Sequence, residues 1–195
     1  MPPRVLIPLA DGFEEIEAVA IIDTLRRAGV TVVTAALRAD PLRVVHGAHG
    51  IDLVADTELG AQTGDFDALV LPGGMPGTKH LADDPRVLAL VREMQRAGKH
   101  VAAICAAPSV LAKAGVLEGV AATSYPGFQD KLAGARVERG SRVVVAGRIV
   151  TSQGPGTALE FALELVRLLV GSDKSAELER AMIVSQPRGA SVARG

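Results

Sequence analysis

A single cysteine, Cys105, lies between a short apolar segment and a proline in a chain of 195 residues. Residues 101–104 are typical of a buried strand, and Pro108 is typical of the first turn of a helix. A thiol at such a sharp strand-to-helix turn has the geometry of a nucleophile elbow. Backbone N–H groups and the positive end of the helix favour a thiolate, so we expect Cys105 to be ionised at neutral pH. A cysteine that serves only as a small buried apolar residue is the alternative.

Two other segments that follow predicted strands carry groups for the same reaction. Gly73 and Gly74 could turn their N–H groups toward an oxyanion, although paired glycines also form tight turns without a ligand. Glu14 and Glu17 begin a predicted helix and fall on its apolar side. A partly buried carboxyl group has a raised pKa and can transfer protons near neutral pH. Acidic residues in a first turn can equally serve only to complement the helix dipole.

A histidine partner for the cysteine is hard to find. His100 begins the strand that ends before Cys105, so it lies roughly 16 Å away at the opposite edge of the sheet. His46 and His49 fall at the tip of a predicted hairpin. Two exposed histidines without further ligands rarely bind a metal, so we predict no metal site. Tyr125 is the only tyrosine and could serve as a packing residue or as the wall of a pocket.

Strands and helices alternate along most of the chain, which predicts how these groups are positioned. Such alternation gives an open, mostly parallel sheet with helices on both faces, and ligands bind at the carboxyl ends of its strands. The expected elements are strands at 5–9, 30–36, 67–71 and 100–104, hairpins at 43–54 and 143–150, and helices at 14–28, 85–97, 108–114, 157–170 and 174–183. Residues 185–195 are expected to form a flexible tail.

Composition limits the classes of protein that fit. Hydrophobic residues make up 48% and charged residues 22%, which is typical of a globular chain with a large core. A net charge of −1 provides no basic surface for nucleic acid or an anionic membrane. One cysteine excludes an internal disulfide and a cysteine-cluster zinc site, and no apolar run of about 18 residues occurs. The first residues are not typical of a signal peptide, so we expect a soluble cytoplasmic protein.

Four motifs in a fixed order carry a family resemblance, at residues 10–17, 71–74, 102–108 and 151–157. On them the chain resembles the ThiJ/PfpI superfamily, and within it the branch of the human parkinsonism-associated protein deglycase and the bacterial YajL-like proteins. The resemblance implies a flavodoxin-like three-layer α/β sandwich, a single domain over residues 1–184, and a homodimer. It also implies that Cys105 is the reactive, oxidisable cysteine and that Glu17 is the carboxyl group beside it.

The resemblance extends to residues around this pair. Glu14 would support Glu17, and the backbone of the two glycines and of Ala106 would form the oxyanion site. Tyr125 stands where several relatives have histidine, so a Cys–His–acid triad is not expected. His49 stands where the human relative has arginine, in a hairpin that could approach the partner's pocket. The supporting residues under this resemblance are Glu14, Gly73, Gly74, Ala106, Tyr125, Arg27 and His49.

The activity that the resemblance implies is a cofactor-independent glyoxalase of the glyoxalase III type, or a protein deglycase. Its substrates would be methylglyoxal, glyoxal or early glycation adducts on protein side chains, and its products lactate or glycolate, with no metal and no nicotinamide. The alternative is a non-enzymatic, peroxide-sensing and chaperone-like stress protein. A hydrolase or hydratase of the wider superfamily is a third class, which the missing histidine disfavours. Neither a membrane nor a specific nucleic acid is expected as a partner.

Overall fold

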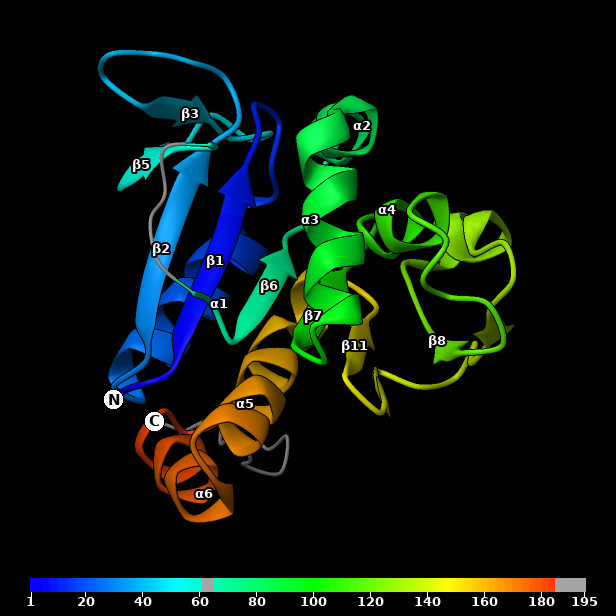
Figure 1. The fold of residues 1–195 in the computed structure, drawn as a ribbon. Coiled ribbons are helices and arrows are strands. Elements are labelled where there is room, and N and C mark those ends of the chain that lie inside the picture. Colours follow the sequence, from blue (N-terminus) through cyan, green and yellow to red (C-terminus); the bar gives the residue numbers. More distant parts are fainter. Residues whose placement is uncertain (61–64, 185–195) are drawn as a thin grey trace, which may run out of the picture.

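The central element of the fold is a seven-stranded sheet in the order β10-β11-β7-β6-β1-β2-β5 (Figure 1). It is seen in a computed structural model that describes residues 1–60 and 65–184, so the tail expected at 185–195 lies outside the described residues. Neighbouring strands are parallel except β10 and β11, which pair antiparallel at one end. The chain runs outward from β1 through β2 to β5 and returns to β6, so the strand order reverses between β1 and β6. Ligand sites in such sheets lie at the carboxyl ends of the strands beside this reversal.

The strands and helices have the following bounds. The main sheet contains β1 (Arg4–Leu9), β2 (Thr31–Ala36), β5 (Thr57–Glu58), β6 (Ala68–Leu71), β7 (His100–Ile104), β10 (Val143–Ala146) and β11 (Ile149–Ser152). Two small pairs are β3 (Val44–His46) with β4 (Asp52–Val54), and β8 (Ala121–Ala122) with β9 (Arg136–Val137). The α-helices are α1 (Glu15–Arg27), α2 (Gly77–Asp83), α3 (Pro85–Arg96), α4 (Pro108–Lys113), α5 (Ala158–Leu169) and α6 (Ser172–Ala181). Two short 3₁₀ helices are η1 (Pro126–Lys131) and η2 (Pro155–Thr157).

Helices cover both faces of the sheet. Successive side chains of a strand point to opposite faces, so Ile7 of β1 packs with α1 and α5, whereas Leu6 packs with α2, α3 and α4. Phe161 of α5 and Val91 of α3 are fully buried in the two cores. Burial on both faces explains why the strands are nearly continuous apolar runs. The predicted three-layer α/β sandwich of the flavodoxin-like kind is therefore confirmed.

The structure confirms the main predicted elements and adds several short ones. Both predicted hairpins are present, as β3–β4 and as β10–β11, and β11 also pairs with β7. Asp84 begins α3 as the sequence predicts, because its side chain accepts a hydrogen bond from the backbone N–H of Arg86 at 2.8 Å. The sequence did not predict α2, which begins beside Pro76 in a glycine-rich loop. It also missed β5 and β9, each of which has only two residues.

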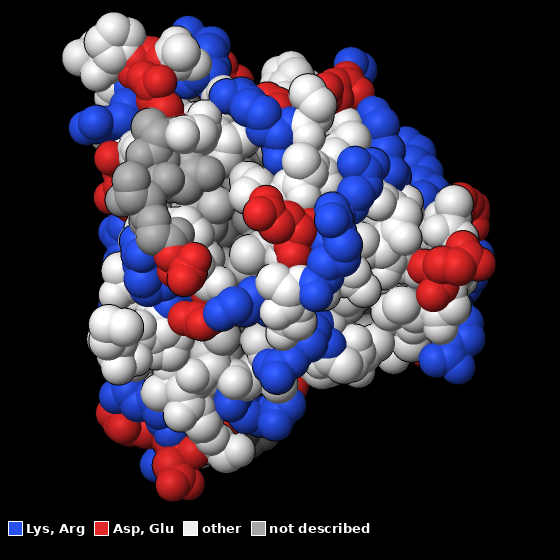
Figure 2. Space-filling view, in the orientation of Figure 1, with Lys and Arg blue, Asp and Glu red and all other residues white. Residues whose placement is uncertain are grey.

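Charged side chains of both signs lie on the surface. Lys and Arg gather along α3 in the view of Figure 2, and Asp and Glu lie beside them. Arg86 of this helix is engaged within the chain, because it donates to Asp84 and to the carbonyl groups of Leu37 and Leu59. None of the helices within residues 1–60 and 65–184 combines the length and the apolar composition of a membrane-spanning segment.

Candidate active site

Cys105 lies at the sharp turn that follows β7. Its backbone has a φ of 63°, in the left-handed region that residues other than glycine rarely adopt. Its N–H donates to the carbonyl of Ser152 at 3.0 Å, and its own carbonyl accepts from the N–H of Tyr125 at 2.8 Å. The turn is therefore held by β11 on one side and by the segment after β8 on the other. The strand-to-helix elbow that the sequence predicts is present.

The sulfur of Cys105 receives hydrogen bonds from two backbone amides. The donors are the N–H groups of Ala106 and Gly74, which come from the loops after β7 and β6. The helix that follows, α4, begins only at Pro108 and has six residues. The two amides therefore act directly on the sulfur, and the short helix adds little. Together the amides can stabilise negative charge on the sulfur or on an oxygen bonded to a carbon beside it.

Glu17 of α1 lies beside the thiol and is fully buried. One carboxyl oxygen, Oε2, accepts a hydrogen bond from the N–H of Gly73 at 2.8 Å. The carboxyl group also accepts a hydrogen bond from the thiol of Cys105. The other oxygen, Oε1, is buried and has no hydrogen-bond partner among the described residues. Burial raises the pKa of Glu17 to about 7, helped by the charge of Glu14 and opposed by the hydrogen bonds from Gly73 and Cys105.

The pKa of Cys105 is raised, which contradicts the lowered pKa that the expected thiolate requires. Burial, followed by the charge of Glu17 and its hydrogen bond, raises the pKa of Cys105 to about 12, although the amides of Ala106 and Gly74 act in the opposite direction. The prediction was wrong because it weighed the amides and the helix end without the buried carboxylate beside them.

The two glycines after β6 have different roles. A Cβ atom on Gly73 would lie 2.6 Å from the Cβ atom of Cys105 and 2.8 Å from Oε2 of Glu17, so only glycine fits there. Its N–H is engaged by Glu17 and is not available to an oxyanion. Gly74 has a φ of 95°, and its N–H reaches the sulfur. Of the three backbone N–H groups expected at an oxyanion site, that of Gly73 is thus engaged by Glu17, whereas those of Gly74 and Ala106 act on the sulfur.

Glu14 and Glu15 belong to a second carboxyl cluster, which includes His49. Glu15 is buried, and it accepts hydrogen bonds from the backbone N–H of His49 at 2.5 Å and from Nδ1 of its ring at 2.9 Å. Nδ1 also lies 3.4 Å from a carboxyl oxygen of Glu14. Burial opposes ionisation, but the hydrogen bonds from His49, Ile51 and its own backbone lower the pKa of Glu15 to about 2. The sequence analysis missed Glu15, because its partners lie in the β3–β4 hairpin.

This cluster is also where the described residues bring possible metal ligands together. One donor atom from each of Glu14, Glu15 and His49 lies within 4.8 Å of the others. Nδ1 of His49 is, however, already bonded to Glu15, and its side chain is 69% exposed. Within its own chain His49 therefore fastens the hairpin to α1, and its contacts are with the two carboxyl groups.

Tyr125 lies next to the cysteine, whereas Arg27 lies far from it. The side chain of Tyr125 is half exposed, and its ring lies beside Gly154. Arg27 is the last residue of α1, roughly 15 Å along the helix from Glu17. It is exposed and forms an ion pair with Asp23 at 2.6 Å. The structure therefore does not bring Arg27 to the candidate site of its own chain, because the helix places it at the opposite end.

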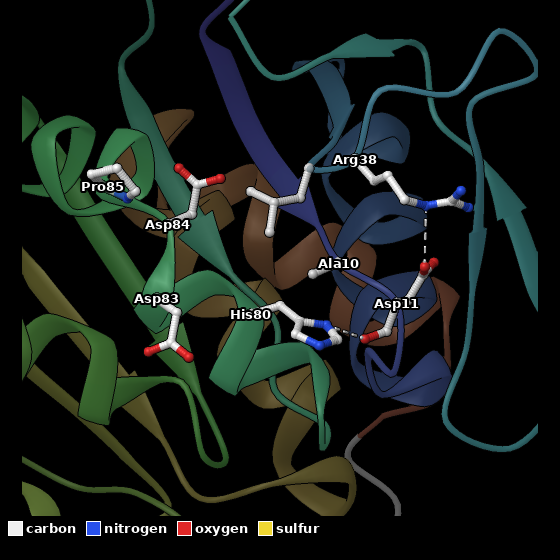
Figure 3. Close-up of a pocket in the computed structure, with 8 residues that line it drawn as sticks. Ala10, Asp11, Arg38, His80, Asp83, Asp84 and Pro85 are labelled. Atoms are coloured by element: carbon white, nitrogen blue, oxygen red, sulfur yellow. Dashed lines mark hydrogen bonds and ion pairs between the residues drawn. The ribbon is translucent and has the colours of Figure 1, made fainter.

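A separate cavity of about 430 Å³ lies at the carboxyl ends of β1 and β2 (Figure 3). His80 and Arg38 both reach Asp11 there: Nδ1 of His80 lies 3.1 Å from its carbonyl oxygen, and Arg38 lies 3.4 Å from its carboxyl group. The lining residues are Ala10, Asp11, Leu37, Arg38, His80, Asp83, Asp84 and Pro85. Cys105 and Glu17 are not among them, so this cavity is distinct from the candidate active site.

Comparison with known proteins gives consistent matches over most of the chain. Residues 3–168 match the DJ-1/PfpI family. Protein dj-1beta of Drosophila melanogaster is 38% identical over 187 residues, which cover 95% of this chain and 99% of that protein. Its crystal structure has a TM-score of 0.91 to this chain and covers 95% of it, with 100% of the fly chain covered.

Some relatives are much longer than this chain, and one has a name that states an enzymatic activity. DJ-1 homolog A of Arabidopsis thaliana is 44% identical over 185 residues, which cover 92% of this chain and 46% of that protein. The chain thus spans less than half of this relative and of DJ-1 homolog B, of which it covers 41%. A Caenorhabditis elegans protein named glutathione-independent glyoxalase DJR-1.2 is 34% identical over 183 residues, which cover 93% of this chain and 96% of that protein. From the fold, the order of its motifs and these matches, the chain belongs to the DJ-1/PfpI family.

Proposed function

We propose that this chain is a cofactor-independent glyoxalase with Cys105 as nucleophile and Glu17 as the group that moves protons. The observation that carries the proposal is the Glu17 carboxyl group. It touches the thiol and has a pKa of about 7, and one of its oxygens has no partner within residues 1–60 and 65–184. A carboxyl group with such a pKa can both accept and return protons near neutral pH. The similarity to the nematode glyoxalase supports the same activity.

The first step is addition of the thiol to an aldehyde. Glu17 takes the proton of Cys105 as the sulfur bonds to the aldehyde carbon, so no free thiolate has to form beforehand. The aldehyde oxygen becomes negative, and the N–H groups of Gly74 and Ala106 stabilise it. Return of the proton from Glu17 to this oxygen gives a hemithioacetal. The carboxylate is then ready for the second step.

The second step moves hydrogen between two neighbouring carbons. Glu17 removes the proton from the former aldehyde carbon, and the adjacent carbonyl is protonated to give an enediol. Protonation of the second carbon and loss of the hydroxyl proton on the first give a thioester. The first carbon is oxidised and the second is reduced, so no external oxidant or cofactor is required. Water then cleaves the thioester, which releases lactate from methylglyoxal or glycolate from glyoxal and restores the thiol.

Removal of early glycation adducts from protein side chains is a second candidate activity of the same site. The side chain of Cys105 is partly exposed, and the nearby Tyr125 is half exposed, so an adduct on a larger molecule has a route to the sulfur. Both reactions begin with the same addition step. The deglycase reaction would therefore depend on the same two residues.

A peroxide sensor fits this site less well than an enzyme does. Oxidation by peroxide proceeds through the thiolate, and the raised pKa of Cys105 keeps the thiolate scarce at neutral pH. A Cys–His hydrolase fits poorly as well, because the histidines bond elsewhere in the described chain. Their partners are Asp52 for His46, Glu15 for His49, the carbonyl of Asp11 for His80, and Arg148 for His100.

We also propose that two copies of this chain associate through α1 and the β3–β4 hairpin. Four apolar side chains there are strongly exposed: Ile16 and Val19 on α1, and Ile51 and Val54 on the hairpin. A second copy would remove them from water, which favours association.

We place the chain in the cytoplasm, whose reducing conditions keep a lone cysteine as a thiol. Residues 1–184 are proposed to form one domain.

The glyoxalase proposal is tested by adding methylglyoxal to the purified protein with a chelator and without added thiols. We expect lactate release by the wild type and none by Cys105→Ser. Arg27→Gln is a matched control in the same chain, because the structure places this residue away from the sulfur. The proposal fails if the wild type releases no lactate, or if Cys105→Ser releases it at the wild-type rate.

A further inference from the structure

The feature that calls for an explanation is the unpartnered oxygen of Glu17. Oε1 is buried and has no hydrogen-bond partner in the part of the chain that the structure describes, although a buried polar atom of this kind normally has one. A Cβ atom built on Gly154 would lie 4.0 Å from Oε1 and 3.5 Å from the ring of Tyr125. The absence of a side chain at Gly154 therefore leaves a gap between the tyrosine ring and the bare oxygen.

The backbone does not require glycine at this position. Gly154 has a φ of 163°, which is extended backbone that any residue adopts. Its N–H donates to the hydroxyl of Thr157 at 3.1 Å, and its carbonyl accepts from the same hydroxyl at 2.9 Å. That hydroxyl also lies 2.6 Å from the hydroxyl of Ser152 at the end of β11. The loop is thus fixed in place, and the missing side chain affects space beside Glu17 rather than the course of the chain.

We propose that Gly154 and Tyr125 determine which substrates the site accepts, an inference that rests on the proposed function. When the sulfur holds the aldehyde carbon of a 2-oxoaldehyde, the neighbouring carbonyl must face Oε1 of Glu17 to receive its proton. The substituent on that second carbon then lies in the gap between Gly154 and the ring of Tyr125. The site therefore takes 2-oxoaldehydes whose substituent is hydrogen or a small alkyl group.

The test compares glyoxal, whose substituent is hydrogen, with methylglyoxal, whose substituent is methyl. In Gly154→Ala the added methyl group occupies the gap, so kcat/KM for methylglyoxal should fall roughly tenfold or more relative to glyoxal. Gly156→Ala is the matched control, because a Cβ atom there meets nothing within 4 Å. Gly156→Ala should leave the ratio of kcat/KM for methylglyoxal to kcat/KM for glyoxal unchanged. Alkylation of Cys105 by iodoacetamide should proceed at the same rate in both variants, which separates substrate size from a damaged thiol.

A second variant enlarges the gap. Tyr125→Ala should raise kcat/KM for phenylglyoxal relative to methylglyoxal by roughly tenfold, whereas Tyr125→Phe, which keeps the ring, should not. The inference is overturned if the wild type is active and neither Gly154→Ala nor Tyr125→Ala changes the ratios. If the wild type turns over none of the three aldehydes, the proposed function itself is wrong and this specificity role is wrong with it.

Discussion

Glu15 and Glu17 are the same residue type on the first turn of one helix, both are buried, and their pKa values move in opposite directions. The pKa of Glu15 falls to about 2, and the pKa of Glu17 rises to about 7. Side chains two residues apart on a helix point to nearly opposite sides, so Glu15 faces the β3–β4 hairpin and Glu17 faces the ends of β6 and β7. Glu15 accepts hydrogen bonds from two N–H groups of His49 and one of Ile51. Glu17 accepts one from an amide and one from a thiol, and one of its oxygens accepts none from any described residue.

The difference shows that burial alone does not decide the charge of a carboxyl group. Burial disfavours the ionised form at both positions, and the number and strength of the donors decide whether it is overcome. Glu15 has enough hydrogen-bond donors to stay ionised at neutral pH, and it holds the hairpin against α1. Glu17 has too few donors, so it remains able to exchange its proton at neutral pH. Four experiments test this difference between the two carboxyl groups.

The largest expected effect is on turnover. Glu17→Gln cannot carry a proton, so kcat for methylglyoxal should fall about 10²- to 10⁴-fold. Glu15→Gln should stay within about tenfold of the wild type, since it contacts the hairpin rather than the sulfur. Removal of the charge beside the thiol should also lower the pKa of Cys105 in Glu17→Gln, so alkylation at pH 8 should become faster while turnover collapses. Steady-state kinetics and iodoacetamide labelling measure the two effects, and normal turnover in Glu17→Gln would falsify the proton-transfer role.

The second effect is the pH dependence of catalysis. The reaction needs the carboxylate of Glu17, whose pKa is about 7, so kcat/KM should rise as the pH is raised through this value. Below it, the rate should fall about tenfold for each pH unit, in proportion to the ionised fraction. Glu15→Gln should show the same profile as the wild type. If kcat/KM of the wild type stayed constant across assays between about pH 5.5 and pH 8, the reaction would not depend on the carboxylate of Glu17.

The third effect is on stability, with opposite signs at the two carboxyl groups. The folded pKa of Glu17 is raised from 4.5 to about 7, so its favourable contribution is complete below 4.5 and is lost as the pH rises through 7. The loss is on the order of 3 kcal/mol. Glu17→Gln should therefore be more stable than the wild type at pH 8, and this gain should shrink toward pH 5. Urea unfolding at both pH values measures it, and a variant less stable than the wild type at pH 8 would count against a buried carboxylate.

Glu15→Gln should show the reverse stability effect. The folded pKa of Glu15 is lowered from 4.5 to about 2, so its contribution is complete above 4.5 and is lost as the pH falls toward 2. At neutral pH the substitution should cost about 1–3 kcal/mol, because the donors in the hairpin lose a charged acceptor. The same urea titrations measure this cost. An unchanged stability at pH 7 would mean that the hairpin is held by other contacts.

The smallest effect is expected for His49→Ala. Its side chain is exposed, and its ring is only one of the donors to Glu15. The destabilisation should therefore be smaller than that of Glu15→Gln. The pKa of His49 is raised by the hydrogen bond and charge of Glu15 and by the charge of Glu14, so the stabilisation is present at low pH and is lost as the pH rises through the folded pKa. An effect that grows with increasing pH would contradict this pairing.

The sequence predicts more of the fold than of the chemistry of the site. Apolar runs that alternate with helical spacing predict the sheet, and the carboxyl ends of its strands bring Glu17, Gly74 and Cys105 to one edge. Glu15 could not be recognised, because its partner His49 lies 34 residues away and only the folded hairpin joins them. The prediction that Cys105 is ionised at neutral pH was wrong for a related reason. The ionisation of Cys105 depends on how deeply a neighbouring carboxylate is buried, which local spacing does not reveal.

The left-handed backbone of Cys105 has a consequence for anyone who sets out to engineer this chain. A residue other than glycine held at a φ of 63° costs about 1–3 kcal/mol, and glycine would relieve much of that cost. Selection for heat resistance alone should therefore enrich Cys105→Gly and discard the sulfur. The backbone at this turn favours the one substitution that ends the chemistry, so a library for thermal improvement should keep residue 105 fixed and score turnover together with melting temperature.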